Sequence, residues 1–402
     1  MVFVEFFDKT SVENICVSLI KLPSKIYLVG PDKNILEEHR KKYISMFSDR
    51  GQNVVIEICV AFRNNINAII ERLTEIVNGN DELYFDLTGG EELYLVAAGI
   101  VYSRFPEKNI QLHRYSIKDS RIIDCDGDGE KIIAEGLPFL SVKENIELYG
   151  GVLRHTEADL SCAALGAEDK EDIREMWRIC SEDPKNWNEQ SGVFAYLTAN
   201  SYEDENSLVI RSSPSVLSRA RKHQPDRKLL RALAERGLIR YEYDSFSFKV
   251  TFKNELVRSC LDKSGKILEL LIYMLASESV DDKGDAAYCD VVSGAFIDWD
   301  GVVTSDRPNT ENEIDVMLMR GVMPIFISCK NGAVIPEEVY KLNTVAEKFG
   351  KGYAKKVLIA SSASNLSSGA LVRCNDMGIK VIDDVDKLSI DSLRKKIDNL
   401  WK

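Results

Sequence analysis

Two short stretches in the last third of the chain decide its fold: N-E-I-D-V at residues 312–316 and F-I-S-C-K-N-G at residues 326–332. In both, polar and apolar residues alternate, which is typical of strands whose two faces meet different surroundings. Residues two apart in a strand share a face, so each stretch presents its polar side chains together. The spacing predicts two neighbouring strands that bring Asp315 and Lys330 to one site.

The residue types at this site are suited to metal-dependent hydrolysis. A carboxylate such as Asp315 can hold a hard divalent cation, and a lysine such as Lys330 can orient water or stabilise charge on a phosphate. The alternative is an ordinary polar strand end, but four of the five residues before Lys330 are apolar, which argues against a surface lysine. Glu269, on an amphipathic helix expected at residues 266–276, is a further candidate acid. The candidate catalytic residues are Asp315, Lys330, Ser328 and Glu313.

The 402-residue chain is too long for one ordinary compact domain, and its pattern changes twice. In residues 1–150, short apolar strands alternate with helices, which predicts a mainly parallel, Rossmann-like α/β domain. Residues 151–262 contain a helix, a glycine and a hairpin at 238–252, the pattern of a winged helix, which fits a structural spacer or a nucleic-acid reader. Residues 263–402 return to α/β in a different order of elements.

Composition and charge exclude several classes of protein. A hydrophobic fraction of 45% excludes a disordered or low-complexity chain. The net charge of -12 argues against a protein that coats nucleic acid or membrane through its overall field. Residues 209–231, however, hold seven Lys or Arg against one acid, a net charge of +6. This stretch is either a phosphate-contacting surface or a solvated linker.

The remaining composition indicates a cytoplasmic protein. Its nine cysteines are scattered singly with no CxxC pair, as in a chain with reduced thiols. Glu5 and Asp8 near the start are unlike a secretory signal, and the longest apolar stretches are too short to span a membrane. Four widely separated histidines make histidine-centred catalysis a poor prediction. We therefore expect no membrane partner.

One motif resembles a calcium site but is better explained as a turn. Residues 124–135, D-C-D-G-D-G-E-K-I-I-A-E, match the pattern of an EF-hand loop. Calcium ligation by that loop requires a helix on each side. Here the flanking residues 115–123 and 131–134 have the composition of strands. We predict an acidic turn of a hairpin.

The last third of the chain resembles the PD-(D/E)xK nuclease core. E-I-D-V, F-I-S-C-K-N-G and the helical run E-E-V-Y-K-L-N-T-V-A-E-K-F-G at residues 337–350 carry the likeness. They are particularly similar to the CRISPR-associated nucleases that join this core to a cyclic-oligoadenylate sensor (CARF) domain. In that core an acid on the first strand binds metal, and the second strand carries an acid, a spacer and a lysine. Asp315 and Lys330 match this pattern.

Ser328 departs from the family pattern, because it stands where the second acid is expected. Another carboxylate would have to compensate, with the backbone carbonyl of Cys329 helping. The resemblance implies a divalent cation, Mn²⁺ or Mg²⁺, held by Asp315, Glu269 and Cys329. The acids able to compensate are Glu269, Glu313, Glu337 and Glu338.

Two turns near the start of the chain resemble the sensor domain of the same family. F-F-D-K-T-S at residues 6–11 and F-D-L-T-G-G-E-E-L-Y-L-V-A-A-G at residues 85–99 each join a strand to a helix. Glycines allow a close approach of backbone to ligand, and a helix N-terminus offers N–H groups to phosphate. In the family, a ring of adenylates lies at these turns across a two-fold dimer. The resemblance implies this role for Lys9, Thr10, Ser11, Thr88, Gly89, Gly90 and Glu91.

The resemblance at both ends of the chain implies a function. It implies a homodimeric, metal-dependent endonuclease of type III CRISPR antiviral defence, activated allosterically by a cyclic oligoadenylate, with cyclic tetra-adenylate as the expected ring. Its expected substrates are single-stranded DNA and/or RNA, with nicking of duplex DNA. The alternative is a ligand-sensing DNA-binding regulator with an inactive nuclease-like domain, which Ser328 and the winged helix favour. The sequence neither supports nor excludes a sensor domain that degrades its own activator.

Overall fold

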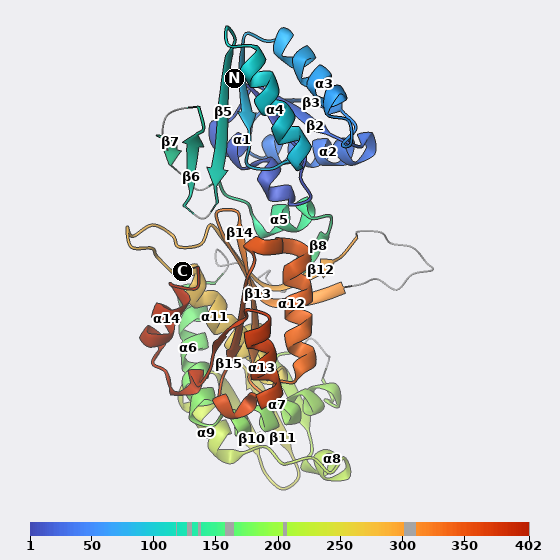
Figure 1. The fold of residues 1–402 in the computed structure, drawn as a ribbon. Helices are drawn as coiled ribbons and strands as arrows, with labels where there is room; N and C mark the ends of the chain where they lie inside the picture. Colours follow the sequence, from blue (N-terminus) through green and yellow to red (C-terminus); the bar gives the residue numbers. More distant parts are fainter. Residues whose placement is uncertain are drawn as a thin grey trace. The chain divides into compact units, whose positions relative to one another are not determined.

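The computed structural model describes residues 1–117, 119–126, 131–135, 138–156, 165–203, 207–300 and 311–401. The chain divides into two compact units, of which Met1–Val152 makes up most of the first. Leu153–Asp298 and Pro324–Lys402 make up most of the second. Strands and helices are combined in both units (Figure 1), which confirms the α/β fold class. Among the described residues, no helix is both long and apolar enough to cross a membrane.

The first unit is built around a seven-stranded sheet. Its strands are β1 (Val2–Phe6), β2 (Lys25–Gly30), β3 (Val55–Val60), β4 (Glu82–Asp86), β5 (Asn109–Ser116), β6 (Arg121–Asp124) and β7 (Lys131–Glu135). They lie in the order β3-β2-β1-β4-β5-β6-β7, and β1 to β5 are parallel. Starting from β1, the next two strands, β2 and β3, are added on one side of it, and β4 to β7 are added on the other side. The strand order therefore reverses between β1 and β4.

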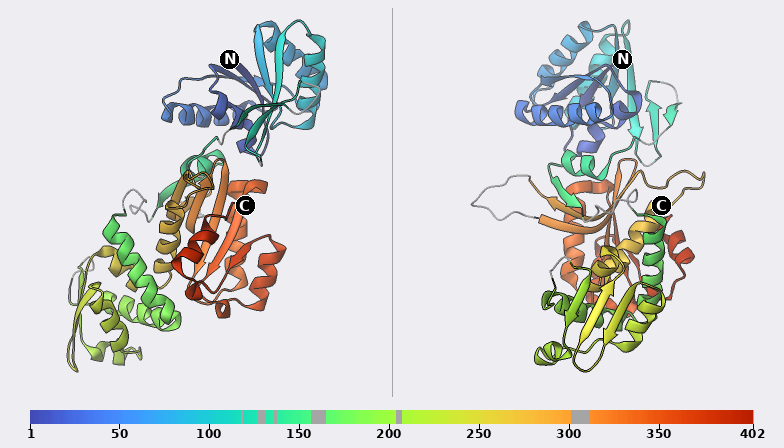
Figure 2. Two further views of the ribbon diagram at one scale, coloured as in Figure 1. Left: turned by 90° about the vertical axis from the view of Figure 1, so that its left-hand side faces the viewer. Right: turned by 180° about the vertical axis from the view of Figure 1, so that it is seen from behind.

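Helices cover both faces of this sheet (Figure 2). They are η1 (Ser11–Asn14), α1 (Cys16–Lys21), α2 (Lys33–Asp49), α3 (Ile66–Asn78) and α4 (Glu92–Arg104), while α5 (Val142–Leu148) packs against α2 and η1. Leu73 of α3 and Ala97 of α4 share one buried core with Val4 and Phe85 of the sheet. On the opposite face, Ser18 of α1 hydrogen-bonds Glu5 of β1. The unit is a three-layer sandwich, as the alternating pattern predicted.

One sequence prediction in this unit was wrong in detail. The strand expected at 115–123 is the end of β5 and all of β6, which pair as an antiparallel hairpin. β6 and β7 are antiparallel too, as predicted for an acidic hairpin around residue 127. Residues 127–130 of that turn lie outside the described residues.

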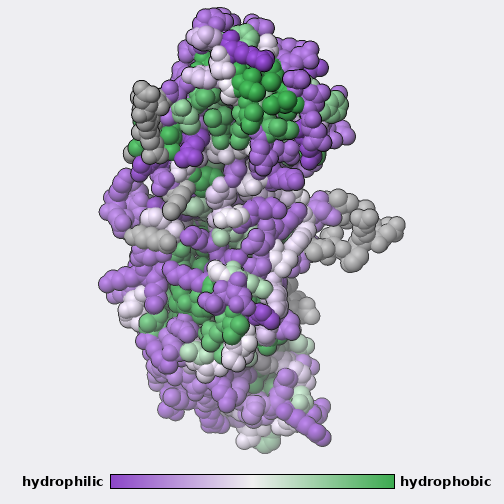
Figure 3. Space-filling model, viewed as in Figure 1, coloured by the Kyte–Doolittle hydropathy of each residue, from purple (hydrophilic) through white to green (hydrophobic). Residues whose placement is uncertain are grey.

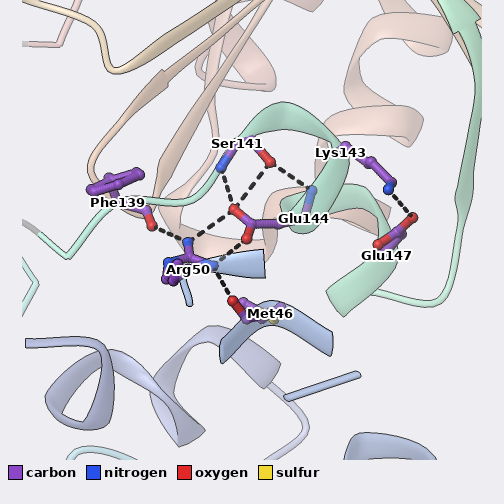
Figure 4. A network of polar contacts seen from close by, with 7 residues as sticks. All are labelled: Met46, Arg50, Phe139, Ser141, Lys143, Glu144 and Glu147. Carbon is purple, nitrogen blue, oxygen red and sulfur yellow. Dashed lines mark hydrogen bonds and ion pairs between the residues drawn. The ribbon is translucent and has the colours of Figure 1, made fainter. Parts of the chain in front are cut away.

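A polar network holds α5 against α2 (Figure 4). Arg50, which follows α2, forms an ion pair with Glu144 of α5, with one nitrogen–oxygen distance of 3.0 Å. Arg50 also donates to the carbonyl oxygens of Met46 and Phe139 at 2.8 Å each. Glu144 completes a capping box with Ser141 at the start of α5. Because Arg50 and Glu144 are only 15% and 13% exposed, water screens the pair weakly.

The second unit contains a six-stranded sheet. Its strands are β8 (Val152–Thr156), β12 (Asp290–Asp298), β13 (Glu311–Arg320), β14 (Met323–Lys330), β15 (Lys355–Ala360) and β16 (Lys380–Ile382). They lie in the order β16-β15-β14-β13-β12-β8, and β14 to β16 are parallel. A two-residue turn joins β13 to β14, where Gly321 supplies the positive φ of +61°. The two stretches that carry the nuclease-like motif are therefore neighbouring strands, as predicted.

Helices flank this sheet as well. They are α6 (Ala167–Glu182), α11 (Lys266–Ser277), α12 (Pro336–Gly350), α13 (Ser368–Asp376) and α14 (Ile390–Ile397). Buried residues of α6 and α11 share one core with Val316 of β13 and Ile327 of β14. Helix α12 packs against β15, and its last residue, Gly350, lies so close to Phe326 of β14 that a Cβ there would be 3.3 Å from the ring.

The rest of the second unit has the winged-helix order of elements. These are α7 (Pro184–Ala199), β9 (Val209–Ser212), α8 (Pro214–Arg219), α9 (Arg227–Glu235), β10 (Ile239–Tyr243), β11 (Phe248–Phe252) and α10 (Glu255–Asp262). β10, β11 and β9 form a small antiparallel sheet. Trp187 of α7 and Phe252 of β11 belong to the same core as the residues of α11. The domain boundaries expected at residues 150 and 262 stay predictions.

Candidate functional sites

The polar residues of β13 and β14 line one small hollow. Glu313 and Asp315 reach it from β13, and Ser328 and Lys330 reach it from β14. The Nζ atom of Lys330 lies 4.0 Å from Oδ2 of Asp315. The structure thus brings Asp315 and Lys330 together, as strand alternation predicted, while their part in catalysis stays a prediction. Helix α12 closes the hollow with Glu338, Lys341 and Leu342.

Ser328 supports Asp315 instead of supplying a second charge. Oδ2 of Asp315 accepts hydrogen bonds from the backbone N–H of Cys329 at 2.7 Å and from the Ser328 hydroxyl at 3.2 Å. Two hydrogen bonds to one carboxylate oxygen fix the orientation of the group. Asp315 is therefore held as an oriented acceptor at the edge of the hollow.

A carboxylate from α12 fills the place near Lys330 that the second strand leaves without an acid. Oε2 of Glu338 lies 2.8 Å from Nζ of Lys330. Burial alone would lower the pKa of Lys330, but the charges of Asp315 and Glu338 outweigh it and hold this pKa above its ordinary value. The hydrogen bond from Lys330 lowers the pKa of Glu338. Lys330 is thus held between two carboxylates of the hollow, those of Asp315 and Glu338.

Two of the predicted metal ligands, Glu269 and Cys329, do not line the hollow. Glu269 of α11 is ion-paired with Lys266 at 3.5 Å, and neither it nor Cys329 is among the described residues that line the hollow. Burial, aided by the charges of Asp315 and Glu269, raises the pKa of the Cys329 thiol well above its ordinary value. A neutral thiol is a poor ligand, which leaves the backbone carbonyl of Cys329 as its donor. Glu337 is exposed at the start of α12.

The second candidate site lies in the first unit, at the carboxyl ends of β1 and β4. Open α/β sheets bind ligands where the strand order reverses, and this sheet reverses between these two strands. The turns after β1 and β4 fit closely against each other. A Cβ on Gly89 would lie 3.1 Å from Cβ of Glu13, and one on Gly90 would lie 2.7 Å from Cβ of Phe6. Gly90 also has a φ of +121°, so the close fit requires glycine at this position, whereas a side chain at Gly89 would have to displace its neighbours slightly.

Asp8 and Asn14 organise the first of these turns, and the sequence analysis did not single them out. Oδ1 of Asp8 accepts from the backbone N–H of Thr10 at 2.7 Å. Asn14 exchanges two hydrogen bonds with the backbone of Asp8, at 2.7 and 3.0 Å. An Asp in a turn commonly hydrogen-bonds the backbone two residues further on, and its place just after a strand could have identified Asp8. Of the predicted ligand residues in this turn, Lys9 is exposed, Thr10 is half-buried and Ser11 is buried.

In the second turn, some of the predicted binding groups already form hydrogen bonds or ion pairs within the protein. The Thr88 hydroxyl donates to Asp86 and accepts from the backbone N–H of Tyr115 at 2.7 Å. Glu91, which precedes α4, lies 3.6 Å from Arg63 in an ion pair. Thr88 therefore shapes the turn, and Arg63 is a basic residue at this edge that the sequence analysis missed, because it follows β3 and lies far from both motifs in sequence.

A buried carboxyl pair lies directly beneath these turns. Glu5 of β1 and Asp86 of β4 are register partners, and they are only 1% and 2% exposed. Burial and the neighbouring charge of Asp86 raise the pKa of Glu5 well above its ordinary value. Burial also raises the pKa of Asp86, to about 6. The pair therefore keeps a proton to a higher pH than exposed carboxyls would, because two adjacent buried carboxylates repel each other.

Comparison with known proteins relates both units to solved structures. No family model matches the chain, and no curated protein matches it. Its fold matches the crystal structure of protein VC1899 from Vibrio cholerae with a TM-score of 0.75 and 15% identity, over 100% of this chain and 96% of that one. It matches Can2 from Sulfobacillus thermosulfidooxidans, solved in complex with cyclic tetra-adenylate, with a TM-score of 0.67 and 16% identity, over 98% of this chain and 99% of that one.

The chain has the fold of VC1899 and Can2. This confirms the fold that the CARF-nuclease resemblance implied. A third structure, a type III CRISPR defence DNA nuclease activated by cyclic oligoadenylate, matches 91% of this chain and 47% of that one, with a TM-score of 0.48 and 14% identity.

Proposed function

We propose that this protein is a metal-dependent endonuclease of type III CRISPR antiviral defence that a cyclic oligoadenylate activates. Its substrates are single-stranded DNA and/or RNA, with nicking of duplex DNA, and it works as a cytoplasmic homodimer. The observation that carries the proposal is the hollow in which Asp315 and Lys330 meet on neighbouring strands. The shared fold with Can2, which was solved with cyclic tetra-adenylate, supports the proposed activator.

The donor groups of the hollow fit a hard divalent cation. Within the described ranges, no three His, Cys, Asp or Glu side chains cluster closely enough to hold a metal by themselves. Mg²⁺ in phosphoryl-transfer sites commonly takes one or two carboxylates and completes its shell with water and substrate phosphate. Asp315 and Glu338 are such a pair, and Glu313 lines the same hollow. Glu338 thus takes the place that Glu269 was expected to fill.

The chain's own residues would then have separate tasks. A bound Mn²⁺ or Mg²⁺ would supply the activation of water and the neutralisation of charge on the phosphate. Asp315 is oriented by Ser328 and the Cys329 N–H, so it is ready as a ligand. Lys330 remains protonated because two carboxylates face it, so its task is to hold water or stabilise negative charge on the phosphate.

The proposed activator fits the turns after β1 and β4. A cyclic adenylate ring presents phosphates and ribose hydroxyls, which Lys9, Thr10 and the backbone N–H groups around Gly89 and Gly90 can bind. The carboxylate of Glu91 can accept from a ribose hydroxyl. The rest of the predicted set, Ser11 and Thr88, is buried or engaged within the turns, so these residues would shape the site.

The homodimer is supported by the outer face of α4. This helix starts directly after the second turn, yet Leu93 and Val96 are 38% and 51% exposed on its outer side. Figure 3 shows an apolar patch over this helix. A large apolar surface beside a ligand site is typical of a protein interface. A two-fold axis near the turns would let one ring contact both copies, because a symmetric interface repeats the same residues on each side.

A cleavage assay tests the proposal. The purified protein is incubated with labelled single-stranded DNA or RNA, with cyclic tetra-adenylate, and with Mn²⁺ or Mg²⁺. We expect scission that requires both the ring and the metal, and that EDTA stops. Asp315→Asn and Lys330→Ala should each lower the rate by about 100-fold or more without changing the melting temperature. Full activity in both variants would refute the proposed site.

The alternative, a DNA-binding regulator with an inactive nuclease-like domain, gives a different result in the same assay. The ring would then change the mobility of labelled DNA in a gel without producing fragments. Ring sizes of four and six adenylates, tested side by side, identify the activator. If the ring disappears during incubation in the absence of substrate, the sensor also degrades it.

A further inference from the structure

Side-chain contacts tie α8, α9 and the β10–β11 hairpin of the winged-helix module into one surface. Gln224, in the turn before α9, donates to the Ser218 hydroxyl of α8 at 3.2 Å. The same side chain accepts from the Tyr243 hydroxyl of β10 at 3.4 Å. The guanidinium of Arg227, at the start of α9, lies 5.0 Å from the centre of the Tyr243 ring. The turn, the start of α9 and the hairpin are therefore held together.

This surface is positively charged, although the whole chain carries a net charge of -12. Six cations of α8, α9 and the turn between them are exposed, and none of them forms an ion pair with a carboxylate among the described residues. Other cations of the same unit are paired, such as Arg236 with Glu175 at 2.8 Å. Unpaired cations grouped on one surface of an acidic protein are typical of a phosphate-binding surface. The six are Arg219, Arg221, Lys222, Arg227, Lys228 and Arg231.

Helix α9 presents its charges outward and its apolar residues inward. Leu229, Leu230 and Leu233 are buried in the core, whereas Arg227, Lys228 and Arg231 are exposed. Asp226 accepts from the backbone N–H of Lys228 at 2.9 Å and caps the helix. In helix-turn-helix proteins, the second helix of the pair lies in the major groove with its N-terminal residues toward the DNA. In α9 the three basic residues lie in that N-terminal half.

The hairpin adds an exposed aromatic side chain. Phe246 at its tip is 87% exposed, which is unusual for a large apolar residue. Asp244 fixes this tip by accepting from the backbone N–H groups of Phe246 and Ser247 at 2.7 Å each. A rigid turn that holds an aromatic ring in solvent is suited to contact a sugar or a base edge in a groove.

The module is joined directly to the nuclease strand. Asn188 of α7 donates to the carbonyl oxygen of Asn331 at 2.6 Å, and the Asn331 amide donates back to Asn188 at 2.8 Å. Asn331 is the residue that follows Lys330 and is only 3% exposed. This amide pair therefore connects α7 directly to the end of the strand that carries Lys330.

We propose that α8, α9 and the hairpin form a docking surface for duplex DNA. The basic face of α9 contacts phosphates along the major groove, and the hairpin reaches an adjacent groove. The module that would bind this duplex is hydrogen-bonded, through α7, to the residue that follows Lys330. That the bound DNA is then cut rests on the proposed function. The binding itself does not, because it requires no cleavage.

The experiment measures binding in EDTA, where no metal-dependent cleavage occurs. The full-length protein is titrated against a labelled duplex and against one of its strands, and fluorescence anisotropy gives Kd over a series of NaCl concentrations. We expect Lys228→Ala/Arg231→Ala to raise the Kd for duplex about tenfold and to lower the slope of log Kd against log salt by roughly 2. Phe246→Ala should weaken duplex binding with no change in this slope.

A matched control removes the same charge elsewhere. Lys395 and Lys396 of α14 are also exposed, so Lys395→Ala/Lys396→Ala should leave duplex binding unchanged. An equal loss in both double variants, or none in the α9 variant, overturns the docking surface. An equal loss for the single strand overturns the assignment to duplex DNA. Cleavage of a single strand by the α9 variant tests the proposed function separately.

Discussion

Glu338 is the carboxylate that we propose as the replacement for the missing second-strand acid. Its carboxylate lies 2.8 Å from Nζ of Lys330, and it lines the same hollow as Asp315. If it is a ligand, Glu338→Gln should lower the affinity for Mn²⁺ by at least about 10- to 100-fold, the loss that is typical when only an outer-shell partner of a metal ligand is removed. Calorimetric titration of Mn²⁺ in the absence of substrate measures this without relying on activity.

Two further variants separate a ligand from a merely structural ion pair. Glu337→Gln makes the same chemical replacement at the neighbouring carboxylate, which is exposed, and should leave Mn²⁺ affinity unchanged. Ser328→Glu in the Glu338→Gln background should restore Mn²⁺ binding, because it returns an acid to the position that the family uses. If Glu338→Gln binds Mn²⁺ as well as the unmodified protein, Glu338 only positions Lys330.

At the scale of single residues, the sequence predicted those positions that strand periodicity determines. Asp315 and Lys330 followed from alternation within two strands, because that rule fixes which side chains share a face. It could not choose among four acids for the place of Ser328, because Glu338 reaches the hollow from a helix whose packing depends on residues such as Gly350 and Phe326. Arg63 was missed for the same reason, since it joins Glu91 only through the arrangement of β3 beside the other strands.

The pairing of β1 with β4 makes the stability of the first unit depend on pH. Glu5 and Asp86 face each other across these strands, and both have raised pKa values because they are buried. The folded state therefore holds a proton that the unfolded state releases above about pH 4. Where the folded state binds more protons, the free energy of unfolding falls as pH rises. We expect this fall from pH 4 through pH 6 and above.

The variant Glu5→Gln tests this cross-strand pair. It removes one titrating group, so the melting temperature should fall less between pH 5 and pH 8 than in the unmodified protein. The difference should be at least about 1 kcal/mol, or a few °C. Glu71→Gln, an exposed change on α3, serves as the control and should keep the original pH dependence. Identical pH profiles for all three proteins would contradict the shared proton.

Elements with strong periodicity were predicted well, and those without it were not. The parallel strands and the longer helices of the first unit followed from apolar runs and spacing. Helix α7 was missed because Gly192 and several polar residues interrupt its apolar pattern, and its stability comes from burying Trp187 and Phe194 in the shared core. The β5–β6 turn was missed because Ser120 adopts a φ of +55° there, where glycine or asparagine would have marked the turn.

At the scale of the whole molecule, the proposed activation by a cyclic oligoadenylate should depend on the apolar face of α4. A symmetric ring that contacts two copies requires the two copies to meet beside the turns after β1 and β4. Val96 is 51% exposed on α4, so a charge there costs little in the isolated chain but would be buried without a partner in the dimer. We therefore expect Val96→Glu to be folded, monomeric and about 100-fold less responsive to cyclic tetra-adenylate.

Light scattering coupled to gel filtration gives the mass of each variant, and the cleavage assay gives its response to the ring. Val372→Glu, at a valine of α13 that is 58% exposed in the second unit, introduces the same charge at a similar exposure and should remain dimeric and active. A dimeric Val96→Glu that still responds to the ring would place the interface elsewhere. A monomeric but fully responsive Val96→Glu would show that one copy suffices to bind the activator and transmit its effect.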